Sequence, residues 1–131
     1  MSRRTIDTLI IDLDNTIFDW FAVWFSSFEP IYKEIIRVTE MPSDKVEADI
    51  CAVHRSRRTS EYTFLLDEVA ALESLRKTDD VRTVFHKAID ESKRGRDHNL
   101  KLYPTVFRCL WDLKRRGTKI VAYTESMGFY S

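Results

Sequence analysis

Residues 6–19 read Ile6-Asp7-Thr8-Leu9-Ile10-Ile11-Asp12-Leu13-Asp14-Asn15-Thr16-Ile17-Phe18-Asp19. The first part of this segment ends in three consecutive apolar residues, Leu9 to Ile11, and Asp12 follows them. A short apolar run closed by polar residues is typical of a strand that is buried on both faces, as in a parallel sheet. We therefore expect a buried strand at 6–11.

Two carboxylates, Asp12 and Asp14, follow this strand at a spacing of two residues. In an extended segment such residues point the same way, so both charges would share one small volume. Like charges this close destabilise each other unless a cation joins them or one of them holds a proton. Magnesium accepts oxygen ligands of this kind, and a protonated carboxyl group can act as a general acid. The same residue types also favour turns and helix caps, so a purely structural alternative stays open.

A second short strand is expected at 119–123, where Ile120-Val121-Ala122-Tyr123 precedes Thr124. In open α/β sheets, ligands bind outside the carboxyl ends of the strands. If the two strands are parallel neighbours, Thr124 lies within a few ångströms of Asp12 and Asp14. This expectation favours a chemical role for Asp12 and Asp14 over a role in a turn.

The residues between the two strands are expected to be helical. Apolar positions in 20–99 recur at intervals of three and four, and no sustained alternation appears. The pattern predicts a first helix with a kink or break at Glu29–Pro30, then three more: one from Ser43, one over about 60–76, and one that follows Thr78 and is closed by 93–96. A last helix is expected to open at Tyr103–Pro104 and to end at a left-handed Gly117.

The composition excludes several classes of protein. The chain has 131 residues, with 21 Lys and Arg against 21 Asp and Glu, so no global field attracts nucleic acid or an anionic membrane. Its two cysteines form neither a disulfide framework nor a zinc ribbon. We expect a cytoplasmic protein that binds neither nucleic acid nor a membrane.

The sequence resembles a known family at both of its ends. The run from Asp12 to Asp19 looks like the first motif of the haloacid-dehalogenase-like (HAD) hydrolases. The stretch from Leu102-Tyr103-Pro104 to Tyr123-Thr124 resembles the segment that leads into the second motif of that family. The resemblance implies an α/β fold: a Rossmann-like HAD core, incomplete in this chain with about two parallel strands, formed by 1–19 and 100–131. Residues 20–99 would be a mainly helical cap inserted after the first strand.

The resemblance also implies a function. By it, Asp12 is the nucleophile that takes the phosphoryl group and Asp14 is the general acid/base. Thr124 and the backbone N–H of Glu125 would bind the phosphate, and Mg2+ would be held by the carboxylate of Asp12 and the backbone carbonyl of Asp14. The expected enzyme is a magnesium-dependent phosphatase acting on a small phosphorylated metabolite, because Asp14 points to phosphate esters rather than carbon–halogen bonds.

This chain departs from the family pattern in one respect. The family also uses a Lys or Arg from a third motif and acidic metal ligands from a fourth, and none can be assigned here. The chain alone is therefore expected to be inactive. We expect a second polypeptide, either the C-terminal remainder of the same product or another copy, to complete the core.

Two other interpretations remain. One is a catalytically incomplete HAD fragment that acts as a binding or dimerising module. The other is a phospho-acceptor receiver domain, which also uses carboxylates, Thr and Lys on an α/β sheet. The long helical stretch from about 18 to 95 counts against the receiver, because that fold alternates strands and helices closely.

Overall fold

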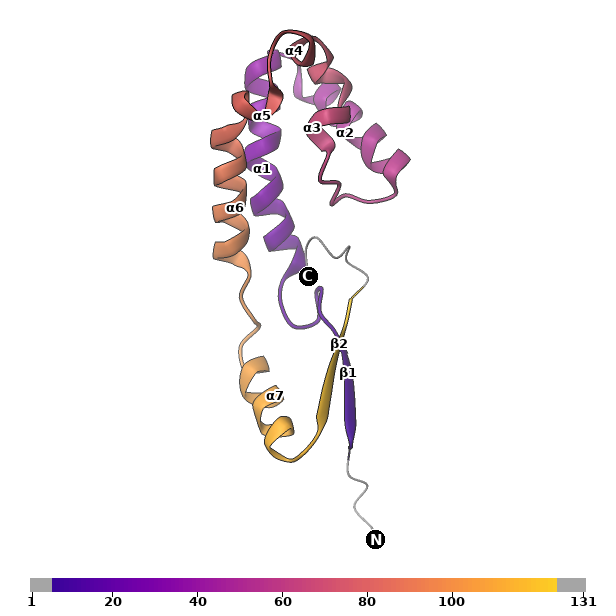
Figure 1. Cartoon of the computed structure of the whole chain (residues 1–131), viewed down its shortest axis with the longest axis vertical. Helices are drawn as coiled ribbons and strands as arrows, with labels where there is room; N and C mark the ends of the chain where they lie inside the picture. The colour runs from indigo at the N-terminus through magenta and orange to yellow at the C-terminus, as the bar shows by residue number, and fades with distance from the viewer. Residues whose placement is uncertain (1–5, 125–131) are drawn as a thin grey trace. The chain divides into compact units, whose positions relative to one another are not determined.

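A computed structural model describes residues 6–124 of the chain (Figure 1). The elements in chain order are β1 (Thr8–Asp12), α1 (Trp20–Thr39), α2 (Ser43–Arg57), α3 (Leu65–Glu68), the 3-10 helix η1 (Ala70–Leu72), α4 (Glu73–Thr78), α5 (Val81–Val84), α6 (His86–Asn99), α7 (Val106–Arg115) and β2 (Lys119–Tyr123). The chain divides into two compact units. We call 1–23 with 98–131 the strand unit and 24–97 the helical unit. Two parallel strands among helices give the mixed α/β class that the sequence indicates.

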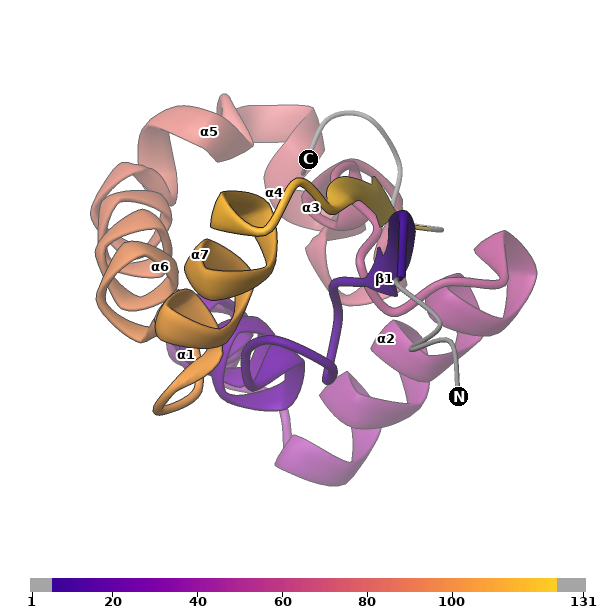
Figure 2. The same cartoon turned by 90° about the horizontal axis from the view of Figure 1, so that it is seen from below.

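The strand unit is built on one pair of parallel strands. β1 and β2 pair with Leu9 opposite Ile120 and Asp12 opposite Tyr123. The connection that enters β2 is anchored by Thr118, which is 7% exposed and whose Oγ1 donates to the carbonyl of Ile6 at 3.0 Å. Helix α7 lies beside the strands and contacts β2 (Figure 2). Because parallel strands end at the same edge, this register brings the residues after both strands together.

The expectation of a strand buried on both faces is wrong for the described residues. Leu9 and Ile11 are half-buried, whereas Ile10 between them is 69% exposed. Side chains alternate between the faces of a strand, so one face of β1 meets its own unit and the other meets solvent. The strand also begins and ends one or two residues later than expected, at Thr8 and Asp12.

One boundary of α7 was predicted correctly and the other was not. Gly117 has φ of +87° and follows the last residues of α7, as expected of a left-handed cap. The helix, however, begins at Val106 rather than at Pro104. Thr105 has φ of +72°, which lies outside the helical region, so the turn at Pro104 cannot continue into the helix.

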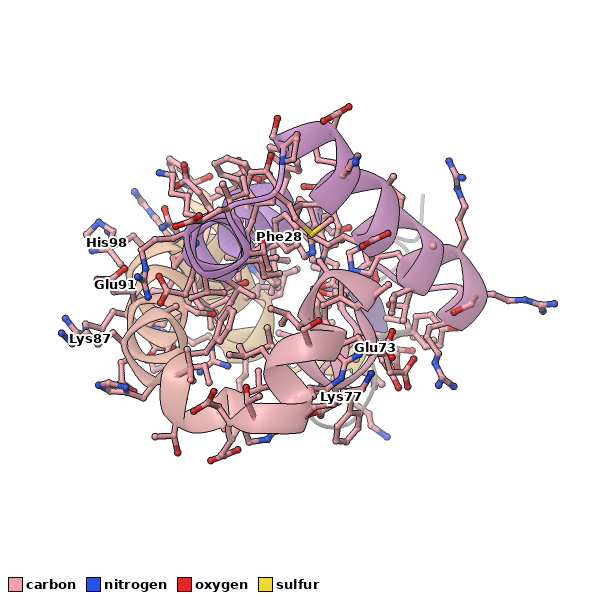
Figure 3. The ribbon with its side chains drawn as sticks, turned by 90° about the horizontal axis from the view of Figure 1, so that it is seen from above. Phe28, Glu73, Lys77, Lys87, Glu91 and His98 are labelled. Atoms are coloured by element: carbon pink, nitrogen blue, oxygen red, sulfur yellow. The ribbon has the colours of Figure 1, made fainter. Side chains whose placement is uncertain are left out.

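The helical unit contains every buried apolar residue among those the structure describes. They are Ile35, Val46, Ile50, Val53, Leu65, Val69, Leu72, Val81, Phe85 and Ala88. Figure 3 shows Phe28 directed among these helices, while Lys87 and Glu91 point away from α6 and the ion pair of Glu73 with Lys77 lies on α4. The core of the described chain thus belongs to the helical unit, as its three-and-four periodicity predicts.

A kink or a break was expected at Glu29–Pro30, and the break does not occur, because α1 continues with Pro30 inside it. Rings at spacings of four residues stack across the proline. Phe28 lies 4.9 Å from Trp24 and 6.0 Å from Tyr32 between ring centroids. This packing holds both halves of the helix together, although Pro30 cannot donate a hydrogen bond to the carbonyl of Ser26.

Helix α6 also continues where the sequence predicted its end. Gly95 lies within it, because the helix runs on to Asn99. A Cβ atom built on Gly95 would stand 2.4 Å from the carbonyl oxygen of Ser26 in α1. In a regular helix this carbonyl would accept from the N–H of residue 30, which Pro30 does not have. The residue without an N–H and the residue without a side chain therefore lie at the same carbonyl. Gly95 therefore permits close packing of α1 and α6 rather than ending α6.

The helix expected over about 60–76 is divided into α3, η1 and α4. Val69, fully buried, has extended backbone angles of −62° and 126° that interrupt the helical hydrogen bonds. The Arg76 guanidinium replaces them in part, because Nη1 donates to the carbonyls of Leu66 at 3.2 Å and Val69 at 2.9 Å. A side chain from a later helix thus stabilises a bend that periodicity alone does not reveal.

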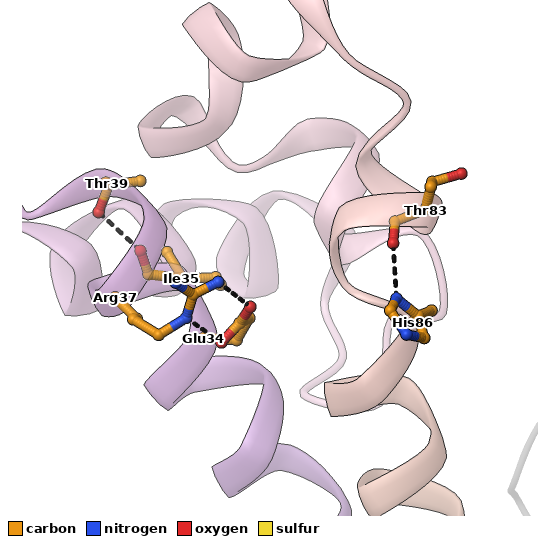
Figure 4. A network of polar contacts seen from close by, with 6 residues as sticks. All are labelled: Glu34, Ile35, Arg37, Thr39, Thr83 and His86. Atoms are coloured by element: carbon orange, nitrogen blue, oxygen red, sulfur yellow. Dashed lines mark hydrogen bonds and ion pairs between the residues drawn. The ribbon is translucent and has the colours of Figure 1, made fainter.

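Local polar contacts stabilise the surface of the helical unit (Figure 4). The guanidinium of Arg37 donates to both carboxylate oxygens of Glu34, at 2.7 and 2.6 Å, and these bonds lower the pKa of Glu34. Nδ1 of His86 lies 2.8 Å from the carbonyl of Thr83, at the junction of α5 and α6. Such exposed contacts each contribute little to stability, so the buried core dominates.

Replacing Gly95 by Val should destabilise the helical unit by about 1–3 kcal/mol, the usual cost of forcing extra atoms into a packed site. Valine has a better helix propensity than glycine, so a loss of stability would report the clash with Ser26. Chemical denaturation followed by circular dichroism measures the change. Glu91→Val, on the exposed face of the same helix, is the control and should cost well under 1 kcal/mol. Equal losses in the two variants would show that the close approach is not needed.

Stability should fall as the pH is lowered through the titration of His54. Partial burial, with the ring 6.2 Å from Phe28, lowers the pKa of His54 below its ordinary value of 6.5. The unfolded chain then binds this proton more readily than the folded one, so the stabilisation is complete above pH 6.5 and declines below it. Denaturation between about pH 7 and pH 5 should show a decline that His54→Gln removes. The exposed His98, replaced by Gln, is the control; an unchanged slope in His54→Gln would contradict the assignment.

Candidate functional site

The candidate site lies where β1 and β2 end side by side. Asp12 is the last residue of β1 and pairs with Tyr123, the last residue of β2. Just beyond the two strand ends, Oγ1 of Thr124 donates to Oδ2 of Asp14 at 3.2 Å. These residues are 110 positions apart in the chain, and the predicted meeting of Asp14 with Thr124 is confirmed by this bond.

The carboxylate of Asp12 is oriented by Thr16, a residue of the quoted segment for which the sequence predicts no separate role. Oγ1 of Thr16 donates to Oδ2 of Asp12 at 2.8 Å. Asn15 makes this possible, because its φ of +56° turns the chain back, a conformation that Asn tolerates better than most residues. The backbone N–H groups of Thr16 and Ile17 both donate to the carbonyl of Leu13 and close the turn. The signal in the sequence was Asn15, directly before Thr16, because Asn tolerates the left-handed conformation of such a turn.

The segment that follows Asp14 is attached to the chain before α7. Isolated bridges link Phe18 to Asp14 on one side and to Leu102 on the other. The N–H of Tyr103 also donates to the carbonyl of Ile17 at 2.8 Å. Segments from both ends of the chain therefore hold this loop in place.

Asp19, the last acid of the quoted segment, has a structural role. Its Oδ1 accepts from the N–H of Ala22 at 2.9 Å, in the first turn of α1. A carboxylate in this position satisfies an N–H that the helix itself leaves without a partner and also interacts favourably with the helix dipole. Asp19 therefore caps α1, while Asp14 contacts the end of the other strand.

The oxygen atoms at the site partly fit a magnesium ion. Asp12 can contribute its carboxylate and Asp14 its backbone carbonyl, and magnesium commonly takes one or two carboxylates and keeps several waters. Within residues 6–124, no group of three or more His, Cys, Asp or Glu side chains is placed to hold a metal. Further acidic ligands would have to come from elsewhere. Glu125, whose N–H was predicted to bind phosphate, lies outside the described residues.

A hollow of about 330 Å³ lies along α7 rather than at the strand ends. Its lining residues are Thr105, Arg108, Cys109, Asp112, Leu113 and Arg116. Since Asp12, Asp14 and Thr124 do not line it, this hollow is not the candidate site.

Comparison with protein-family models, with curated protein sequences and with solved structures gives no match to this chain. The fold and the site therefore stand on the sequence and the geometry alone. Within the described part of the chain, the helices also fall short of the length and apolar character that crossing a bilayer requires.

Proposed function

We propose that this chain carries the nucleophile and the general acid/base of a magnesium-dependent phosphatase of the HAD type, acting on a small phosphorylated metabolite. The observation that supports it best is the hydrogen bond from Thr124 to Asp14 at the adjoining ends of two parallel strands. An enzyme needs side chains from separate segments at one point, whereas a turn or a cap needs only local partners. The contact spans almost the whole chain.

In this proposal Asp12 and Asp14 divide the chemistry. An oxygen of Asp12 attacks phosphorus; a bond from that oxygen to phosphorus forms, and the ester bond to the leaving oxygen breaks. Asp14 gives its proton to the leaving oxygen and then takes one from the water that hydrolyses the acyl phosphate. Splitting one difficult displacement into two easier ones is the advantage of such covalent catalysis.

The neighbouring hydroxyls would position these groups. Thr16 holds Oδ2 of Asp12, which fixes the direction of the carboxylate before it attacks. Thr124 would turn its hydroxyl from Asp14 to an oxygen of the transferred phosphoryl group. Magnesium, when bound, would supply positive charge for the phosphoryl oxygens.

The other catalytic groups of such an enzyme, a Lys or Arg and acidic metal ligands, would come from a further segment that covers the strands. Ile6, Ile10 and Tyr123 are 66%, 69% and 55% exposed. Parallel sheets are almost always covered on both faces, so these side chains fit a surface on which more of a core packs. In the proposal, that segment also brings the Lys or Arg and the acidic ligands absent here. It would be the remainder of the same product or another copy.

The same exposed surface supports a second candidate, a non-catalytic module that binds or dimerises through its strands. The residues present serve both candidates, so an assay must separate them. We would measure hydrolysis of an aryl phosphate with Mg2+ by this chain and by the longest polypeptide that its gene encodes. The phosphatase proposal expects activity from the longer form, abolished by a chelator and restored by Mg2+. No activity in either form would favour the binding module.

A further inference from the structure

Helix α7 has an aromatic and cationic face that its packing on β2 does not use. Val106, Leu110 and Leu113 are its half-buried positions. At 3.6 residues per turn, Phe107 and Trp111 lie to one side of that apolar stripe. They are 68% and 54% exposed.

The two rings form one continuous apolar ridge. Phe107 and Trp111 are four residues apart, with ring centroids 6.1 Å apart and planes inclined by 19°. Rows of side chains at this spacing are the ridges that pack into grooves of a second helix. Trp is also among the residues that contribute most to binding at protein interfaces.

Cations are frequent beside the ridge and just after α7. In residues 105–119 there are five, Arg108, Lys114, Arg115, Arg116 and Lys119, against one acid, Asp112. Within residues 6–124, no ion pair joins any of these cations to an acid. The whole chain is neutral, so this positive charge is local to α7 and the residues that follow it.

We infer that an acidic amphipathic helix of another protein binds this face of α7. We call the face the α7 surface and define it as Phe107, Arg108, Trp111, Lys114 and Arg115. Apolar side chains of the partner would pack along the ridge, and its acids would meet the flanking cations. A second copy of the chain fits poorly, because a two-fold pairing through this surface would set cations against cations. Nucleic acid fits less well than a helix, because Phe107 and Trp111 stack on each other and so offer bases fewer free ring faces.

The test uses this chain with three fluorescent probes. They are a helical peptide with Leu on one face flanked by Glu, the same peptide with Lys in place of Glu, and a single-stranded oligonucleotide. Fluorescence anisotropy should show binding of the acidic peptide that weakens with salt. Trp111→Ala should weaken it about tenfold or more, as should Arg115→Glu. Phe64→Ala, which removes a ring that is 51% exposed in the helical unit, should leave it unchanged.

Several outcomes would overturn the inference. They are equal binding of the acidic and basic peptides, no effect of Trp111→Ala, or tighter binding of the oligonucleotide. Light scattering adds one more, because a dimer that Trp111→Ala dissociates would assign the surface to a second copy. Asp12→Asn should not change peptide binding, so the inference can fail or succeed independently of the proposed phosphatase.

Discussion

Replacing Asp12 by Asn should abolish hydrolysis of an aryl phosphate by the active form, whereas Asp14→Asn should slow it by about 10²–10⁴-fold. In the Asp12→Asn variant, the amide would have no anionic oxygen to attack phosphorus. In the Asp14→Asn variant, the amide would retain an oxygen that can accept from Thr124 but would have no proton to give to the leaving group. Steady-state rates with Mg2+ measure both effects.

The two losses should differ in kind as well as in size. A better leaving group needs less help from an acid. Among aryl phosphates, those that release a more acidic phenol should therefore rescue Asp14→Asn more than Asp12→Asn. Asp7→Asn, at an exposed acid just before β1, is the matched control and should retain activity. Wild-type rates in both site variants would remove the assignment.

Replacing Phe85 by Ala should destabilise the helical unit by about 3–5 kcal/mol. Phe85 is fully buried between α5 and α6 and is the largest such side chain among the described residues. Its removal leaves a cavity in the core that Ile35, Leu72 and Val69 share with it. Since small proteins have only about 5–15 kcal/mol of stability, the loss should be large in chemical denaturation.

Phe64→Ala is the control for this prediction, because the same ring is removed from a side chain that is 51% exposed. We expect that variant to unfold within about 0.5 kcal/mol of the parent. A comparable loss at both positions would mean that Phe85 is not in the core of the helical unit.

The parts of the fold that periodicity controls could be predicted from the sequence. The helical character of the middle of the chain follows from apolar intervals of three and four, and the meeting of Asp14 with Thr124 follows from parallel strands that end at one edge. Both predictions needed only local pattern and simple topology. The phosphate-binding and catalytic roles of these residues stay predictions.

The errors fall where distant contacts override local signals. Gly95 and Pro30 were expected to end or break helices, because each weakens a helix on its own. Gly95 instead lies against the carbonyl of Ser26, where a side chain would clash, and Pro30 lies inside a helix whose rings stack on both sides of it. The bend at Val69 depends on Arg76 in the same way. Thr16 is a separate case, because its contact with Asp12 is local but depends on the left-handed backbone of Asn15.

The central claim, that Asp12 receives a phosphoryl group, is tested most directly by trapping that group. The active form would be mixed with substrate and Mg2+, quenched in acid and digested, and its peptides analysed by mass spectrometry. We predict a phosphoryl group on the peptide that contains Asp12, released by hydroxylamine and absent from Asp12→Asn. Turnover with no phosphoryl group on Asp12, or with one on another residue, would contradict the claim.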